Sequence, residues 1–230
     1  MTSPKIIVIL GVVATFGAFM GVLADFFSAW SPNPSEMETA FSVSLDSIRG
    51  FYEGKPRWTF VLGNYFGVLF IPLHILGFFL AYHALKPASP KWAMVYLAVS
   101  VYIIPVGVGL HGSLAFIGDI IQFGDEGLID GIRVYWEPWA FYMVVGYSIV
   151  SILILSLILT GRSLYPRWVA LVSPIGFVVF SSILTAILPD SANGLKVFLS
   201  ITGLNLPLMA FFAVTTWVLV IHRKEISLSL

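Results

Sequence analysis

Six long apolar runs follow one another along the chain, separated by short segments in which polar and charged residues gather. A hydrocarbon layer about 30 Å thick takes roughly 20 apolar residues of α-helix to cross, and each run reaches that length. The sequence shows no strand-like alternation of apolar and polar residues, which a membrane barrel requires. The pattern predicts an all-α polytopic integral membrane protein with six transmembrane helices in one bundle, at about 6–30, 58–85, 92–122, 134–160, 168–188 and 196–221.

Composition favours a single transmembrane domain over residues 1–230. Hydrophobic residues make up 58% of the chain and charged residues only 10%, too few for the surface of a soluble domain. The first run, 6–30, exceeds the roughly 7–15 apolar residues of a cleaved signal peptide, so it is interpreted as a retained span. The formal net charge of +0 indicates no nucleic-acid partner, and the absence of cysteine excludes disulfides and thiolate metal sites.

The distribution of charge predicts the orientation in the membrane. With six spans, the basic residues gather on one side, where Glu225 is the only acid, whereas acids outnumber bases on the other side. Basic residues in the short loops of one face mark that face as cytoplasmic. Both termini are therefore predicted to be cytoplasmic, in a plasma (inner) membrane. The basic residues of that side are Lys5, Lys86, Lys91, Arg162, Arg167, Arg223 and Lys224.

The longest connection, residues 31–57, is predicted to be an extracytoplasmic loop. Ser35 and Glu38 stand at the spacing of a capping box, which predicts a short helix over Thr39–Arg49. Apolar residues along one side of that helix suit a position on the outer surface or over a cavity. A plain ordered connector is the alternative.

Ionisable and amide side chains inside the apolar runs are the best functional evidence in the sequence. Such groups are costly in hydrocarbon and usually face the interior of the bundle. With a rise of 1.5 Å per residue, the predicted topology places several of them near the outer side of the membrane. A polar, outward-facing pocket is the simplest explanation. The residues concerned are Asp25, Asn64, His111, Glu137 and Asn205.

Asp25, His111 and Glu137 are the candidate catalytic residues, because carboxyl and imidazole groups can exchange protons with a substrate. For His111 the alternative is hydrogen-bonded packing between helices, and for Glu137 it is solvation at the outer surface. The candidates for contact with a ligand are Asn64, His74, Tyr142 and Asn205.

His74 differs from the other candidates in its predicted depth. Counted along the predicted spans, it lies about 24 Å below the outer surface, and His111 differs from it in depth by most of a bilayer. This separation disfavours a haem held between the two histidines. Without any two-histidine metal motif, no cofactor is predicted, although a zinc site formed by Asp25, His111 and Glu137 stays geometrically open.

Three stretches of the first half resemble a known family. They are the run GVVATFGAFMGVLAD from Gly11 to Asp25, the run GVLFIPLHILGFFLAYHAL, and the run GLHGSLAF. The chain is similar here to small six-span membrane proteins of bacteria and fungi that form a family of unknown function. In that family a Gly-rich first span ends in an Asp and a His lies late in the third span, so the resemblance singles out Asp25 and His111 but implies no activity.

Three functions fit these features. The first is a membrane protein whose outward-facing polar and aromatic pocket binds a lipid-like or other small hydrophobic ligand, with membrane lipids as its other partners. The second is a membrane-embedded enzyme acting on a lipid or isoprenoid, with Asp25 or Glu137 as acid or base and His111 as its partner. The third is a structural subunit of a membrane complex, in which the polar groups serve only to pack helices.

Overall fold

The computed structural model describes residues 4–30, 44–52, 54–124 and 126–222, and the regular structure among them is helical throughout. The predicted all-α class is confirmed for this part of the chain. Short 3₁₀ segments lie at three of the connections between helices, at Ile71–Leu73, Arg167–Val172 and Asp190–Ala192. The α-helices are α1 (Pro4–Ala29), α2 (Leu45–Arg49), α3 (Arg57–Phe70), α4 (His74–Leu85), α5 (Pro90–Phe123), α6 (Glu126–Leu159), α7 (Pro174–Ile187), α8 (Asn193–Ile201) and α9 (Asn205–Ile221).

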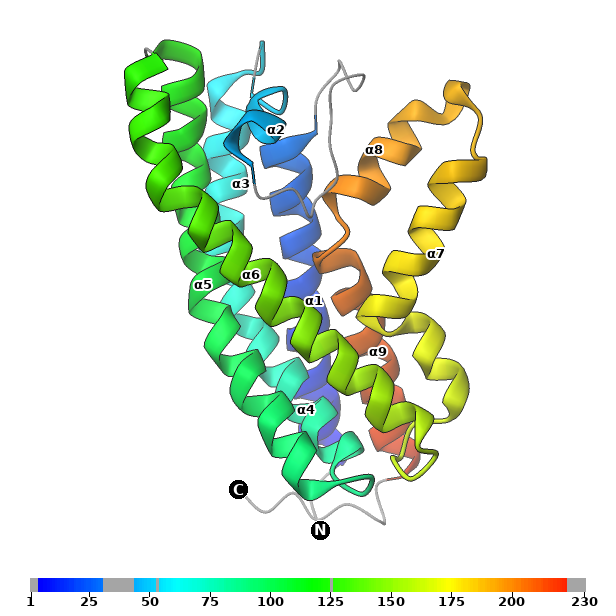
Figure 1. Ribbon diagram of the computed structural model, residues 1–230. Coiled ribbons are helices and arrows are strands. Elements are labelled where there is room, and N and C mark those ends of the chain that lie inside the picture. Colours follow the sequence, from blue (N-terminus) through cyan, green and yellow to red (C-terminus); the bar gives the residue numbers. More distant parts are fainter. Residues whose placement is uncertain (1–3, 31–43, 53, 125, 223–230) are drawn as a thin grey trace.

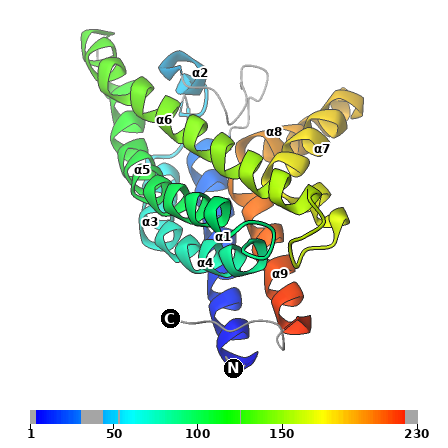
Figure 2. The same ribbon diagram turned by 60° about the horizontal axis from the view of Figure 1, so that its bottom comes forward.

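Helix α1 runs through the middle of the bundle and packs against α3, α4 and α9 (Figure 1). On the other side of α3 and α4 lies α5, and α6 packs on α5 while crossing the bundle obliquely. Helices α7 and α8 stand together at one side (Figures 1 and 2). Because α1 begins and α9 ends at the same end of the bundle, we call this the terminal end and the opposite one the distal end.

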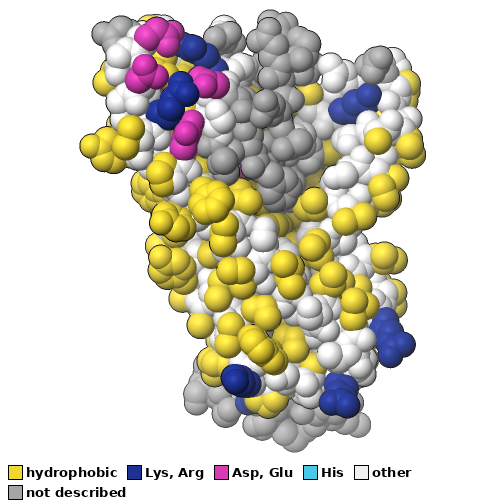
Figure 3. All heavy atoms as spheres, viewed as in Figure 1, with side chains coloured by type: hydrophobic (Ala, Val, Ile, Leu, Met, Phe, Trp, Pro, Cys, Tyr) yellow, Lys and Arg dark blue, Asp and Glu magenta, His cyan; other side chains and the backbone are white. Residues whose placement is uncertain are grey.

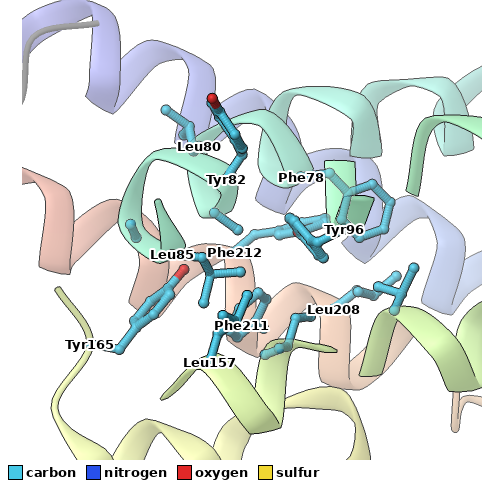
Figure 4. Packing of buried hydrophobic residues seen from close by; sticks show 14 of the residues in the cluster. Phe78, Leu80, Tyr82, Leu85, Tyr96, Leu157, Tyr165, Leu208, Phe211 and Phe212 are labelled. Carbon is cyan, nitrogen blue, oxygen red and sulfur yellow. The ribbon is translucent and has the colours of Figure 1, made fainter. Parts of the chain in front are cut away.

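Two apolar cores fill the bundle, one toward each end. The core of the terminal half includes residues of α1, α4, α5, α6 and α9, and within it Phe78 packs against Tyr96 and Phe212 (Figure 4). The rings of Phe78 and Phe212 meet edge to face at 5.3 Å, a favourable arrangement for aromatic side chains. The distal core contains Tyr52, Phe60 and other buried residues of α2, α3, α5, α6 and α8.

Four helical segments are long and apolar enough to cross a membrane: 4–29, 57–85, 90–123 and 126–159. Helices α8 and α9 pass the same test together, but they meet at a bend of 69°. By length and composition, the described residues therefore supply four candidate spans, or up to five if the bent pair counts as one. The coarser prediction, a protein of several apolar membrane-spanning helices, agrees with this arrangement.

The predicted fifth span, 168–188, is not one continuous helix. It consists of the 3₁₀ segment Arg167–Val172 and the 14-residue helix α7, with Ser173 between them. A residue that precedes proline avoids the helical region for steric reasons, and Ser173 is extended (φ −65°, ψ 157°) before Pro174. Its hydroxyl accepts the Gly176 N–H at 3.3 Å and so begins α7 afresh.

The residues between the third and fourth predicted spans, 123–133, are mostly helical, because α5 extends to Phe123 and α6 already begins at Glu126. Each of these helices has 34 residues and is about 51 Å long, more than the thickness of a bilayer. A helix that continues into water no longer needs apolar residues. Its charges then pair along the helix, as Arg133 and Asp130 do at 3.6 Å.

The short helix α2 covers the distal end. It includes residues 45–49 of the predicted helix Thr39–Arg49, whose residues 39–43 lie outside the described part of the chain. Three contacts tie α2 to α6: Arg133 pairs with Asp46 at 2.9 Å, Arg49 pairs with Glu126, and the Glu137 carboxylate accepts the Leu45 N–H at 3.0 Å. We call these contacts the latch. Glu137 therefore serves the attachment of α2.

Close contact between α1 and α3 depends on a missing side chain at Gly63. A Cβ at this position would lie 2.7 Å from the carbonyl oxygen of Ala24 and 2.8 Å from the amide nitrogen of Ser28. Both atoms belong to the backbone of α1, so the clash could be relieved only by moving the helix. Small residues at such contacts let membrane helices approach closely.

Gly63→Ala is therefore expected to lower the stability of the protein by about 1–3 kcal/mol, the usual cost of overpacking. Thermal unfolding in detergent micelles, followed by circular dichroism, measures the change. Gly131→Ala is the matched control, because a Cβ there meets nothing within 4 Å. Equal unfolding midpoints for the two variants would show that the contact at Gly63 does not limit the packing.

A buried amine lies next to α2 at the distal end, just before α3 begins. The side chain of Lys55 is buried, and its Nζ has no hydrogen-bond partner among the described residues. Desolvation lowers the pKa of Lys55 from 10.5 to about 7. Since the unfolded chain binds this proton up to higher pH, the free energy of unfolding should rise between pH 7 and 9.

Lys55→Met is expected to weaken this pH dependence and to stabilise the protein by about 1–3 kcal/mol at pH 7, because it removes an unpartnered buried polar group. Unfolding midpoints at pH 7, 8 and 9 test this. Higher pH is avoided because burial also raises the pKa of Tyr52, which reverses the trend once tyrosine ionises. The lowered pKa of Lys55 is contradicted if the unfolding midpoint of the wild type does not rise over this range. It is also contradicted if Lys55→Met changes neither this rise nor the midpoint at pH 7.

Candidate functional site

Asp25 of α1, His111 of α5 and Asn205 of α9 meet between the two apolar cores. The Asn205 amide donates to Asp25 Oδ2 at 2.8 Å, and His111 Nε2 lies 3.6 Å from Asp25 Oδ1. The side chains of His111 and Asp25 are only 11% and 12% exposed. We call these three residues the central cluster. Its carboxyl group is held by one amide, while the imidazole stands just beyond direct hydrogen-bond distance.

Glycines on the neighbouring helices leave room for this cluster. A Cβ at Gly67 of α3 would lie 2.5 Å from His111 Nδ1, and a Cβ at Gly21 of α1 would lie 2.6 Å from Asn205 Oδ1. The imidazole and the amide are therefore packed directly on helix backbone. Larger residues at either glycine would push a member of the cluster out of place.

Asn64 of α3 binds the backbone of α5 at His111. With its amide nitrogen directed toward α5, it donates to the carbonyl oxygens of His111, at 2.6 Å, and of Gly112, at 2.9 Å. Asn64 lines neither of the cavities described below. The structure thus places it in the contact between α3 and α5, next to the backbone that carries the His111 side chain.

Two cavities adjoin the central cluster. The distal cavity, of about 110 Å³, lies next to Asp25 and His111 under the residues that follow α2. The inner cavity, of about 50 Å³, is lined by His74, His111 and Asn205 and by apolar residues of the terminal core. Four residues line both: Leu110, His111, Met143 and Leu204. Each cavity has room for a few water molecules or a small polar group.

The predicted difference in depth between His74 and His111 is wrong, since both residues line the same inner cavity. The error arose from the length of α5. Measured from Phe123, where α5 ends, His111 is about 18 Å into the helix, and His74 is about 26 Å from Arg57, where α3 begins. These two helix ends lie side by side, joined by the ion pair of Arg57 with Asp119 at 2.7 Å.

Several buried polar atoms around the cavities have no hydrogen-bond partner among the described residues: His74 Nε2, His111 Nδ1 and the indole Nε1 of Trp136. His74 lines the inner cavity, Trp136 lines the distal one, and His111 lines both. Buried polar groups are normally paired with protein, water or a ligand, and leaving one unpaired is costly. The site therefore offers unused hydrogen-bonding capacity on both sides of the central cluster.

Two predicted site residues lie away from the cluster. Glu137 accepts the backbone N–H of Leu45 in the latch. Tyr142 is 65% exposed and lines neither cavity. The conceivable zinc site of Asp25, His111 and Glu137 is not assembled: in the described part of the chain, no three His, Asp or Glu side chains are placed to hold a metal ion.

Sequence reasoning missed two residues that line the cavities. Trp136 stands near the start of the fourth predicted span, where tryptophan typically anchors a helix at the membrane surface, yet it is 4% exposed and lines the distal cavity. Tyr147 lines the inner cavity, and its hydroxyl donates to the Leu204 carbonyl at 3.2 Å. A tyrosine in the middle of an apolar run was a usable signal for Tyr147, because its hydroxyl needs a partner there.

The comparisons with known proteins place the chain in a family without an assigned activity. Searches of the curated proteins and of the solved structures found no match. A family model described as a family of unknown function (DUF6796) matches residues 1–221. Since this match extends over nearly the whole chain, the protein belongs to that family of unknown function, DUF6796.

Proposed function

We propose that this protein binds a neutral amphipathic molecule within the membrane and holds its polar head at the central cluster. The observation that carries the proposal is the arrangement around Asp25: a carboxyl group tied to Asn205 faces an imidazole at 3.6 Å, next to two cavities. Three separate helices bring these groups together. Polar groups inside a membrane bundle are expensive and commonly mark a functional site.

The charges of the lining favour a neutral head. No Lys or Arg is among the described residues that line either cavity, and Asp25 is the one carboxyl group there. A phosphate or carboxylate head would have to lie beside that carboxyl group without a cation to balance it, at a high cost in a dry interior. A hydroxyl, carbonyl or amide head instead can pair with the amide of Asn205 and with His74 Nε2, which has no partner among the described residues.

A second candidate function is acid–base catalysis on such a molecule. The 3.6 Å between His111 Nε2 and Asp25 Oδ1 is longer than a direct hydrogen bond, so a polar group of the ligand that lies beside the pair, and not between the two atoms, can contact both. Carboxyl and imidazole groups are the usual general acids and bases of enzymes. In this reading, Asp25 and His111 exchange a proton with the head of the ligand, and Glu137 stays in the latch.

Removal of the cluster's hydrogen bonds is the test of ligand binding. Asn205→Leu or Asp25→Leu should reduce the neutral lipid-like molecules that co-purify with the protein in mild detergent by about tenfold or more, since a hydrogen bond to a charged or buried group is worth about 1.5–3 kcal/mol. Mass spectrometry of solvent extracts measures the amount. Tyr142→Leu, at an exposed position away from the cavities, is the control.

The same extracts separate the two candidate functions. If Asp25→Asn retains a ligand but yields a chemically different molecule from the wild type, Asp25 acts in a reaction. If it yields the same molecule, the site only binds. Extracts that do not change with Asp25→Leu or Asn205→Leu, in variants that unfold at the wild-type temperature, contradict both.

We also propose six membrane crossings, with both termini in the cytoplasm of a cell whose inner membrane holds the protein. Support comes from the charges: in the view of Figure 3, the terminal end carries Lys and Arg side chains, whereas Asp and Glu gather at the distal end. Among the described residues of the terminal end are Lys5, Lys86, Lys91, Arg162 and Arg167. In this topology the segment 167–187 and the bent pair α8–α9 provide the fifth and sixth crossings.

The chain contains no cysteine, so a single introduced cysteine reports its own location. A maleimide that does not cross membranes is expected to label Gly131→Cys and Ser191→Cys on intact cells or spheroplasts, but to label Pro87→Cys only after permeabilisation. All three positions are exposed and lie in connections or in the protruding helix end. Labelling of Ser191→Cys only after permeabilisation would refute the fifth and sixth crossings.

A further inference from the structure

A groove runs between α6 and α7 on the side of the bundle, with a volume of about 340 Å³. Exposed apolar side chains flank it, including Ile149 on α6 and Val179 and Ile183 on α7. In a membrane protein, such a surface faces the hydrocarbon of the bilayer. The groove itself is lined by Val144, Tyr147, Ser148, Ser151, Ile152, Ile175 and Val178.

The lining of this groove suits a hydrocarbon chain. None of its lining residues is charged. The Ser151 hydroxyl, one of its few polar groups, already donates to the Tyr147 carbonyl at 2.7 Å. The groove therefore offers few hydrogen bonds to a polar head, whereas an alkyl chain needs none.

The groove adjoins the cavities of the central cluster through two side chains. Tyr147 lines both the groove and the inner cavity, and Val144 lines both the groove and the distal cavity. Tyr147 is only 3% exposed, and its hydroxyl donates to the carbonyl of Leu204, next to the bend between α8 and α9. Tyr147 thus stands between the groove and the inner cavity, and Val144 stands between the groove and the distal cavity.

We propose that the groove between α6 and α7 holds the hydrocarbon tail of the neutral ligand, which enters sideways from the bilayer and passes Tyr147 to reach the central cluster. This inference rests on the proposed function and adds the class of ligand: a single-chain amphipath with an uncharged head, such as a long-chain alcohol. The tail stays in the groove while the head lies beside Asp25 and Asn205.

Photolabelling with a long-chain primary alcohol that carries a diazirine at the far end of its chain tests the proposal. Irradiation of the purified protein in detergent micelles should produce adducts on peptides containing Ile152 or Ile175. Val178→Trp fills the groove and should reduce these adducts by about tenfold. The control is Phe180→Trp, at a 58% exposed position on the side of α7 turned away from Val178, which should leave them unchanged.

The variants Val178→Trp and Asn205→Leu distinguish a failure of this proposal from a failure of the proposed function. Adducts that Val178→Trp does not reduce, in a variant that unfolds at the wild-type temperature, overturn the groove but leave the cluster as a head site. Adducts that persist at full level in Asn205→Leu show that chains occupy the groove without a head at the cluster, and overturn the link between them. Competition by an unlabelled long-chain alcohol, but not by the corresponding alkyl phosphate, is expected if the head is neutral.

Discussion

The burial of one carboxyl group is the constraint on which the rest of the structure depends. Asp25 lies inside an apolar bundle, where an unpaired polar or charged group costs several kcal/mol. Asn205 from the start of α9 answers that need with a direct hydrogen bond, and His111 from α5 stands opposite. To bring these groups together, α9 must begin at the level of Asp25. The bend of 69° between α8 and α9 places its first residue there.

Glycines at the helix contacts make room for the central cluster. The contacts at Gly21, Gly63 and Gly67 let α3 and α9 lie directly against neighbouring residues, so that polar groups from different helices reach one another. In a bilayer, helices gain little from hiding apolar surface, because lipid tails are equally apolar. Close backbone contact and hydrogen bonds such as that of Asn64 with the α5 backbone provide the stabilisation instead.

Hydrophobic patterning predicted the all-helical class and most helix positions, because apolar run length directly reflects bilayer thickness. The grouping of Asp25, His111 and Asn205 followed from counting helical rise. The same counting failed for the separation of His74 and His111, since it treated α5 as no longer than the membrane is thick, whereas this helix has 34 residues. The parts that depend on tertiary contact, such as Trp136 beside a cavity and Glu137 in the latch, leave no trace in spacing along the chain.

The two cavities beside the central cluster are bounded by different kinds of contact. On the distal side, α2 is held by the buried side chains of Leu45 and Ile48 and also by two ion pairs, each worth at most about 1 kcal/mol and weakened by dissolved salt. On the side of the groove, Tyr147 lies between the groove and the inner cavity among uncharged neighbours, and dissolved salt does not weaken contacts between uncharged side chains. Dissolved salt therefore weakens only the charged part of the attachment of α2, and it leaves the uncharged contacts around Tyr147 as they are.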